Sequence, residues 1–232
     1  MAALGIGRLR ILHMDKFELL AHFSALPTGN IADACAKLGV SCRIVTGLHP
    51  VAAGLKRAAG YAVTIKQMIR SVDAEESVLT RHADVIDNHL GKGELLVVDV
   101  GGKDSPCTGG ALLALRAQTS GAAGFLINGC MRDIEEIAAL KFPVFLKGGC
   151  PIKSSPSLET VGINIPVEIN DTQIVPGDLI VMDETGVIVV PAKHAEAVCK
   201  EAERIFALEE KVEKLVRQGH GVIESLAIAA KN

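Results

Sequence analysis

The sequence contains no tryptophan and one tyrosine, and aromatic residues make up only 3% of its 232 residues. Proteins that bind single-stranded nucleic acid stack the bases on exposed aromatic rings, which this chain hardly has. Its formal net charge of −3 does not indicate the basic surface that nucleic-acid binding requires. We therefore expect no nucleic-acid partner.

Long apolar runs are also lacking. No stretch approaches the ~20 apolar residues that span a bilayer. The apolar start of the chain is interrupted by Arg8 and Arg10, and no small-residue cleavage site follows. None of the six cysteines forms a C-x-x-C pair, and 49% hydrophobic residues can build a core without disulfides. We expect free thiols, a cytoplasmic location and no membrane partner.

The chain begins with helical patterns. Apolar positions at helical spacing predict a helix over 15–26, with Asp15 as its cap. A second helix is predicted over about 30–38, with Asn30 as its cap and Gly39 as its stop.

Strands and helices then alternate through the middle of the chain. Short apolar runs predict four strands: 60–66, 94–100, 123–128 and one that begins at 142–145. Helices are predicted after the second and third of these strands, ending near Gly121 and near residue 141. This order predicts βαβ units and a parallel sheet, an α/β fold.

The C-terminal third has a different pattern. Residues 173–190 are rich in β-formers and turn at 183–186, which predicts a hairpin. About 192–218 form one long amphipathic helix that should pack on the domain or on a neighbouring subunit. With no linker or repeat in evidence, we expect one domain over 1–232, in which 1–14 form an N-terminal extension.

The first loop of chemical interest is Thr108-Gly109-Gly110, between a predicted strand and a predicted helix. Glycines allow close approach to unpaired N–H groups at a helix start, so the loop is suited to a carboxylate or a phosphate. It is no phosphate-binding Gly-x-x-x-x-Gly-Lys loop, because no lysine follows. The alternative is that the glycines only permit a tight turn.

The second loop ends in Arg132-Asp133, again before a predicted helix. Arg132 can donate two hydrogen bonds to one carboxylate, and Asp133 is a hard oxygen ligand suited to Mg²⁺ or Mn²⁺. The alternative is that Asp133 caps the helix and Arg132 points into solvent. Spacing alone favours this alternative.

Both loops resemble the signature of one family. The signature stretches are 109–114 (Gly-Gly-Ala-Leu-Leu-Ala) and 128–133 (Asn-Gly-Cys-Met-Arg-Asp). Weaker matches in the same order extend the resemblance over most of the chain: 29–34, 97–99, 142–145 and 176–191. The family comprises the 4-hydroxy-4-methyl-2-oxoglutarate aldolases and the regulator of ribonuclease E activity A (RraA).

The resemblance implies a swivelling β/β/α domain, assembled as a homotrimer or hexamer with active sites between subunits. It implies that Asp133 binds Mg²⁺ or Mn²⁺, and that the metal polarises a 2-oxo group and stabilises a pyruvate enolate. The implied reactions are retro-aldol cleavage of 4-hydroxy-4-methyl-2-oxoglutarate-type substrates and oxaloacetate decarboxylation. The implied contacts to the pyruvyl carboxylate come from the Arg132 side chain and from the backbone of Gly110, Ala111, Leu112 and Leu113.

Two positions depart from the resemblance, since Ala111 and Asn128 stand where many of the aldolases carry carboxylates. Losing such a group weakens metal binding or proton transfer. Two aspartates are candidate replacements within the chain: Asp99 and Asp104. In the aldolases a glutamate of a neighbouring subunit also assists, and three residues of the long helix are candidates: Glu203, Glu209 and Glu210.

Other reactive side chains have simpler interpretations. Lys147 as a Schiff-base lysine would need a desolvated or cationic setting. Cys107 and Cys130 lie near the predicted site but lack an evident histidine partner, so we expect buried fillers and not nucleophiles. Three histidines lack ligand spacing and are expected at the surface or in the core: His49, His82 and His89.

Two other functions remain open. The chain could be a non-catalytic regulator that binds a ribonuclease, or a diverged enzyme with another 2-oxo or hydroxy-acid substrate. The regulators of the resembled family lack the aspartate after the arginine. This chain keeps Asp133, which favours the enzyme.

Overall fold

The computed structural model describes residues 14–70, 82–154 and 157–231, so the expected N-terminal extension lies almost entirely outside them. Its centre is a run of four parallel strands: β3 (Ala58–Ile69), β4 (Glu94–Lys103), β5 (Gly124–Met131) and β6 (Val144–Gly149). Three helices lie between them in the chain: α3 (His82–His89), α4 (Ala111–Thr119) and α5 (Ile134–Ala139). The predicted βαβ units and parallel sheet are confirmed, and α3 is an addition.

Antiparallel strands widen this sheet. On the β3 side lie β10 (Leu179–Asp183), β11 (Gly186–Val190) and β1 (Arg43–Val45). At the other edge of the sheet, β2 (His49–Pro50) pairs with β6. On β3, β10 pairs with the first residues of the strand and β7 (Leu158–Ile163) pairs with its last residues. The predicted hairpin is β10–β11. A separate small sheet is formed by β8 (Val167–Ile169) and β9 (Thr172–Ile174).

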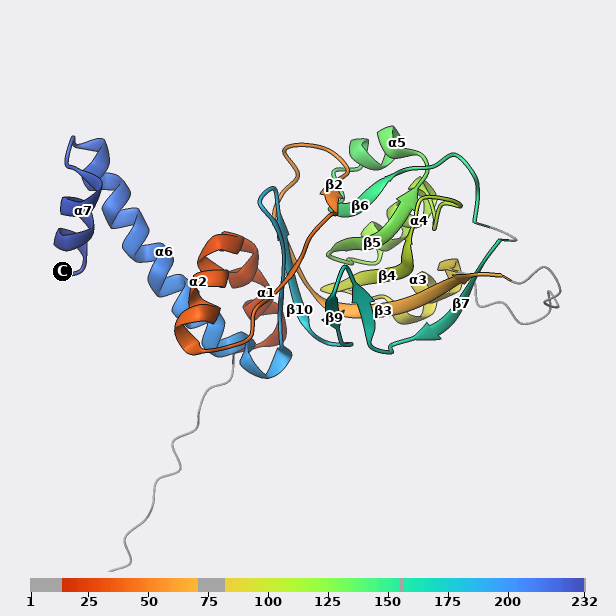
Figure 1. Ribbon diagram of the computed structural model, residues 1–232, viewed down its shortest axis with the longest axis horizontal. Helices are drawn as coiled ribbons and strands as arrows, with labels where there is room; N and C mark the ends of the chain where they lie inside the picture. The colour runs from red at the N-terminus through yellow and green to blue at the C-terminus, as the bar shows by residue number, and fades with distance from the viewer. Residues whose placement is uncertain (1–13, 71–81, 155–156, 232) are drawn as a thin grey trace, which may run out of the picture.

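Apolar side chains fill both faces of the main sheet. One face of β3–β6 packs against α3, α4 and α5, around the edge-to-face pair Phe125 and Phe142. Further along the same face, β10 and β11 pack against α1 (Lys16–Ala25), α2 (Thr28–Leu38) and the start of α6 (Ala195–Arg217) (Figure 1). The opposite face packs against the β8–β9 sheet.

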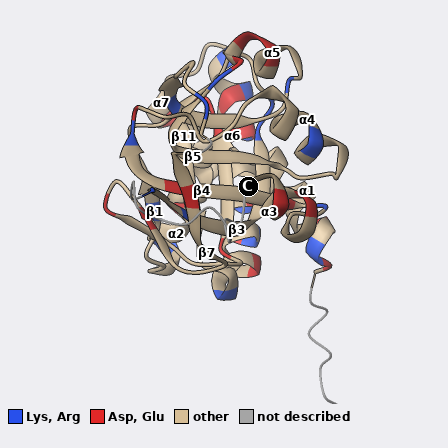
Figure 2. Cartoon of the chain, turned by 90° about the vertical axis from the view of Figure 1, so that its right-hand side faces the viewer, with Lys and Arg blue, Asp and Glu red and all other residues tan. Residues whose placement is uncertain are grey.

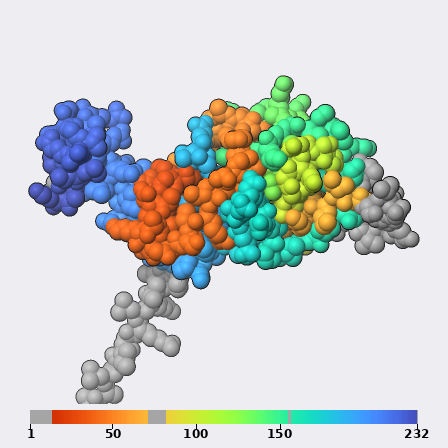
Figure 3. All heavy atoms as spheres, in the orientation of Figure 1, coloured from red at the N-terminus to blue at the C-terminus, as the bar shows by residue number. Residues whose placement is uncertain are grey.

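The predicted C-terminal helix is α6, with Glu196–Lys200 and Glu213–Arg217 ion pairs at 2.7 and 2.5 Å. Its buried residues all lie in its first two turns, and the unpredicted helix α7 (Val222–Ala229) folds back on its end. We call residues 208–229 the C-terminal arm, which stands away from the body in Figures 1 and 3. In the described parts of the chain, no helix is long and apolar enough to cross a bilayer.

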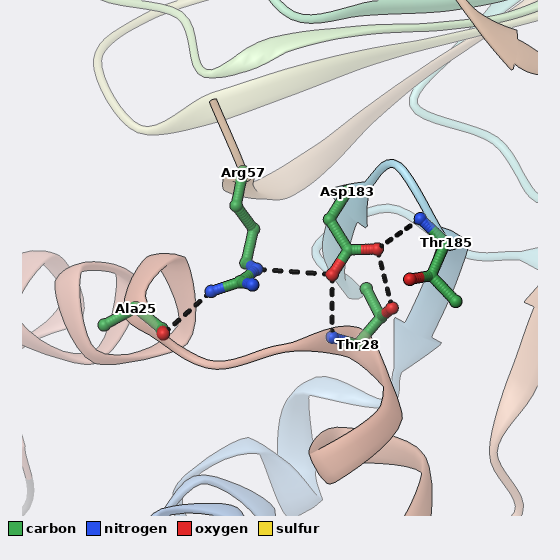
Figure 4. Close-up of polar contacts among 5 residues, drawn as sticks. All are labelled: Ala25, Thr28, Arg57, Asp183 and Thr185. Carbon is green, nitrogen blue, oxygen red and sulfur yellow. Dashed lines mark hydrogen bonds and ion pairs between the residues drawn. The ribbon is translucent and has the colours of Figure 1, made fainter. Parts of the chain in front are cut away.

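Asp183, the last residue of β10, joins the sheet to the first two helices (Figure 4). Its carboxylate accepts hydrogen bonds from the Thr28 backbone N–H at 2.9 Å, the Thr28 hydroxyl at 2.8 Å and the Thr185 N–H at 2.9 Å. Arg57 Nε donates to the same carboxylate at 3.3 Å, and Arg57 Nη1 donates to Ala25 O at 2.7 Å. Burial alone would raise the pKa of Asp183, but these hydrogen bonds outweigh it and lower the pKa.

The Asp183 contact corrects one prediction. α1 begins after the Asp15 cap as predicted, but Asn30 does not cap α2. That helix begins two residues earlier, at Thr28, because Asp183 takes the place of a local cap by binding the Thr28 N–H group. Asn30 instead donates to Glu209 of α6 at 2.6 Å.

Asp183→Asn should lower the free energy of unfolding by about 1–3 kcal/mol at pH 7, because an amide cannot accept all these donors. The pKa of Asp183 is lowered by folding, so its stabilisation is complete above the unfolded value of about 3.9 and is lost as pH falls through the folded value. Urea unfolding should therefore show the parent and variant converging in acid. The matched control is Asp171→Asn at an exposed position; an equal effect there would contradict the assignment.

Candidate functional site

The two loops singled out in the sequence lie side by side at the carboxyl ends of β4 and β5. The Thr108 N–H donates to Cys130 O at 2.8 Å, and the Arg132 N–H donates to Gly109 O at 3.0 Å. Loops at this edge of a parallel sheet commonly bind ligands. The parallel order of the strands thus places the glycine loop against the Arg-Asp loop.

Asp133 lies in the left-handed region with φ of 59°, and its side chain makes no capping hydrogen bond to its own helix, α5. Its Oδ2 instead accepts the Ala111 N–H, at the start of α4, at 3.1 Å. The interpretation of Asp133 as a simple helix cap is therefore wrong. The structure turns this carboxylate away from α5 and across to the neighbouring helix.

Gly110 is required for this contact. A Cβ at Gly110 would overlap Oδ2 of Asp133 and would lie 2.9 Å from Cγ of Arg132. Its φ of −156° is ordinary extended backbone, so the reason for glycine is space and not conformation.

A cavity of about 270 Å³ opens beside these residues. Of the predicted site residues it is lined by Gly110, Leu112, Leu113, Arg132 and Asp133. Ala111 contributes its backbone N–H to Asp133 instead of lining the cavity. The side chains of Arg132 and Asp133 are 45% and 36% exposed, and Arg132 Nε lies 3.4 Å from Asp133 Oδ2.

Sequence reasoning missed two residues that line this cavity, Lys153 and Ser154. They follow β6, the next parallel strand, whose carboxyl end meets the same edge of the sheet. Their position after a parallel strand was the sequence signal that could have identified them as site residues. The cavity thus has two cationic side chains, Arg132 and Lys153, and the carboxylate of Asp133. In the cartoon of Figure 2, positions of basic and acidic residues are interspersed along the chain.

Comparison with known proteins identifies the family of this chain. The family model described as RraA-like, aldolase/RraA, matches residues 28–189, which include both loops and the sheet. This chain belongs to the aldolase/RraA family. The predicted family and its α/β fold are thereby confirmed.

Three relatives of this aldolase/RraA chain are informative. It is 30% identical to an uncharacterized protein of Methanocaldococcus jannaschii, over 94% of this chain and 97% of that protein. It is 36% identical to a Halalkalibacterium halodurans protein provisionally named a 4-hydroxy-4-methyl-2-oxoglutarate aldolase, over 53% of this chain and 59% of that one. The Streptomyces coelicolor RraAS2 structure, titled an unusual member of the RNase ES inhibitor RraA family, shares the fold at a TM-score of 0.75 and 24% identity, covering 85% of this chain and 96% of that one.

Behind the glycine loop of this aldolase/RraA chain lies a buried histidine. His82 Nδ1 lies 2.7 Å from Thr108 O, and no partner of Nε2 is found among the described residues. Burial lowers the pKa of His82 and outweighs the hydrogen bond to Thr108, which would raise it. His82 is therefore a neutral core residue that supports the loop, whereas His49 and His89 are exposed.

Cys107, Cys130 and Cys150 form a small buried cluster under the same loops. Burial raises the pKa of the Cys107 and Cys130 thiols, which disfavours the nucleophilic thiolate. Cys107 and Cys130 are buried, as expected from the sequence. Cys107 also lines the cavity.

The two departures from the family pattern have different surroundings. Asn128 is buried on β5; its Nδ2 donates to Asp99 at 3.3 Å, and no partner of Oδ1 is found in the described part of the chain. Asp99 in turn accepts from Lys66 at 2.5 Å. Neither Asp99 nor Asp104 lines the cavity at Asp133. Asp104 is 82% exposed and pairs with Lys147.

Lys147 is not in a Schiff-base setting. Its ammonium group donates to Gly102 O at 2.6 Å and lies 3.0 Å from Asp104, and its side chain is one-third exposed. This position is neither desolvated nor beside another cation, the settings in which a lysine becomes nucleophilic. This position agrees with the expectation from the sequence that Lys147 does not form a Schiff base.

The candidate glutamates of α6 lie far from Asp133 within one chain, because α6 and α5 are at opposite sides of the molecule (Figure 1). Glu203 contacts His22, and Glu209 accepts from Asn30. Only a neighbouring copy could bring any of them to the cavity.

Proposed function

We propose that this protein is a divalent-metal-dependent carbon–carbon lyase that acts on short 2-oxo diacids and releases pyruvate. The single observation that carries the proposal is the Asp133 carboxylate, which faces the cavity, is held by the Ala111 N–H and leaves its own helix uncapped.

The donor set at the cavity fits Mg²⁺ or Mn²⁺. Asp133 offers one hard, part-exposed carboxylate, and these cations are commonly held by one or two carboxylates with water completing the shell. When bound, the cation supplies Lewis-acid stabilisation of the negative charge that develops on the 2-oxo oxygen. Asp133 would hold it, and the Ala111 N–H orients Asp133.

The cationic groups of the cavity are suited to the substrate carboxylates. Arg132 presents a planar fork that matches one carboxylate, and Lys153 adds a second positive charge. The start of α4, at 110–113, adds a favourable dipole. A dicarboxylate that contains a 2-oxo group satisfies these groups and the cation together.

Among the described residues that line the cavity, Asp133 is the single carboxylate, and this bears on the reaction. Retro-aldol cleavage needs a base to remove the proton of the 4-hydroxyl group, whereas decarboxylation of oxaloacetate breaks its carbon–carbon bond without one. Ala111 cannot supply this base, and Asn128 lies buried beside Asp99. We propose that the residues of one protomer are sufficient for oxaloacetate decarboxylation. Aldol cleavage additionally needs water or a glutamate of a neighbouring subunit to accept the proton of the 4-hydroxyl group.

The substrate assay that tests this function compares pyruvate release from oxaloacetate and from 4-hydroxy-4-methyl-2-oxoglutarate at saturating Mn²⁺. We expect release from oxaloacetate well above that of free Mn²⁺. Release from neither, together with binding to a ribonuclease, would support the regulator instead. Turnover of another 2-oxo or hydroxy acid alone would support the diverged enzyme.

Gly110→Ala should reduce pyruvate release by about 10- to 100-fold, because the new methyl group displaces the Asp133 carboxylate and such misplacement costs on this scale. Stability should change little, since φ of −156° suits alanine. Turnover and urea unfolding measure the two effects. Gly148→Ala, at a position with no atom within 4 Å of the new Cβ, is the control; equal turnover in both variants would contradict the role of Gly110.

We also propose that the protein is a homo-oligomer, as the family resemblance implies, with the C-terminal arm packed on a second copy. The arm makes a groove of about 470 Å³ with apolar residues Leu208, Val212, Val216 and Leu226. Ile223 beside it is 85% exposed. An apolar segment that stands apart from its own core is typical of an interface between subunits.

Sedimentation should therefore give a mass of three or six times 24.4 kDa at micromolar concentration. Leu226→Asp should reduce the mass to the monomer without changing the circular dichroism of the body. Glu224→Gln, on the same helix, should leave it unchanged. A parent that is monomeric would contradict an interface made by the arm.

A further inference from the structure

A second cluster of possible metal ligands lies away from the cavity, between α1 and α6. It consists of His22 in the last turn of α1 and of Cys199 and Glu203 on α6. A ring nitrogen of His22, the Sγ atom of Cys199 and a carboxylate oxygen of Glu203 all lie within 4.8 Å of one another. Among the described residues, no other group of three such ligands meets this condition.

Helix geometry brings the three atoms together. Cys199 and Glu203 are four residues apart, so they point from the same face of α6 on consecutive turns. His22 comes from a segment about 180 residues earlier, and its Nδ1 is in direct contact with Oε1 of Glu203. A single cation between the three groups would be within reach of a donor atom from each of them.

The burial of the three groups differs in a useful way. Cys199 is fully buried in the core cluster that contains Phe23 and Ala202, whereas the side chains of His22 and Glu203 are each 38% exposed. The thiol thus lies on the buried side of the cluster, and the imidazole and the carboxylate lie on the side that faces solvent. A fourth position is available to water from outside.

The donor set selects the kind of metal. A thiolate, an imidazole and a carboxylate are the ligands of Zn²⁺, and three protein ligands with a water give its tetrahedral coordination. The hard cations Mg²⁺ and Mn²⁺ prefer oxygen ligands and would compete poorly here. The cluster therefore differs in chemistry from the single carboxylate of Asp133.

We propose that His22, Cys199 and Glu203 form a zinc site that fastens the base of α6 to α1. Binding replaces the Cys199 S–H bond with a sulfur–zinc bond and releases one proton to solvent. His22 coordinates as the neutral imidazole through Nδ1. Because the C-terminal arm begins within α6, a zinc ion at this site would hold the start of that helix, and with it the arm, against the body of the protein.

The test uses the full-length chain carrying Asp133→Asn, so that the proposed catalytic site contributes no metal binding. Co²⁺, a spectroscopic substitute for Zn²⁺, should give a thiolate-to-cobalt charge-transfer band in the near ultraviolet, and Zn²⁺ should abolish it by displacement. Zn²⁺ should also raise the Tm of this protein in a concentration-dependent way, whereas Mg²⁺ should not.

Three further variants locate the ligands. Cys199→Ser should abolish the band, and Glu203→Gln, at a half-exposed position, should weaken zinc binding by about 10-fold or more while keeping the fold. Cys35→Ser, which removes another buried thiol of the same core cluster, should keep the band. No band in the chain with all six cysteines, a band retained in Cys199→Ser, a band lost in Cys35→Ser, or unchanged zinc affinity in Glu203→Gln would overturn the proposal. The last result would leave a plain hydrogen bond between His22 and Glu203.

Discussion

Asp133→Asn should abolish metal-dependent pyruvate release and leave the fold intact. The change removes the negative charge on which a hard-cation site depends. Stabilisation by a bound cation is worth several kcal/mol, and ~4 kcal/mol corresponds to a fall of about 1000-fold in rate. The fold should survive because asparagine tolerates the left-handed region and its Oδ1 still accepts the Ala111 N–H.

The control for this variant is Asp171→Asn. Asp171 has φ of 64°, close to the 59° of Asp133, and it is exposed and outside the cavity. The same chemical change in the same backbone conformation should therefore leave turnover at the parental level. Mn²⁺ titration of pyruvate release in the three proteins gives the comparison. Equal metal affinity and turnover in the parent and Asp133→Asn would remove Asp133 from the mechanism.

Arg132→Lys should lower kcat/KM by about 10- to 150-fold although the charge is kept. Lysine cannot donate two parallel hydrogen bonds to a carboxylate, and hydrogen bonds to charged groups are worth about 1.5–3 kcal/mol. The loss stays within this range because the Arg132 side chain is 45% exposed in one protomer and solvent screens part of its interaction.

The control for Arg132→Lys is Arg116→Lys on the exposed face of α4, where the arginine pairs with Asp87 at 2.6 Å. It should leave kcat/KM unchanged. The defect of Arg132→Lys should be larger for substrates with the pyruvyl carboxylate than for esters that lack it. A variant that turns over substrate like the parent would rule out the carboxylate contact.

The sequence predicts the sheet because its signals there are local and strong. Apolar runs bounded by glycines mark β4 and β5, and parallel pairing then brings the loops after them to one edge. The meeting of the glycine loop with Arg132-Asp133 follows from that order alone. The family resemblance supplied the chemistry, which neither loop could identify by spacing.

Other features could not be predicted because they depend on long-range contacts. The start of α2 is set by Asp183, 155 residues away along the chain. The Asp133 carboxylate bonds to α4 and not to its own helix, a choice made by tertiary packing. α7 is a short helix of eight residues that follows Gly219 and Gly221. The position of Lys153 and Ser154 after β6 signals the right edge of the sheet but not which side chains of that loop reach the cavity.

The metal dependence of oxaloacetate decarboxylation tests the central claim most directly. The protein is freed of metal with a chelator, and pyruvate release is followed as Mn²⁺ is returned, against the same Mn²⁺ concentrations without protein. The account predicts no enzymatic release before addition, a saturable rise with Mn²⁺, and no such rise for Asp133→Asn. Release by the metal-free protein, or no release above free Mn²⁺ at any concentration, would contradict it.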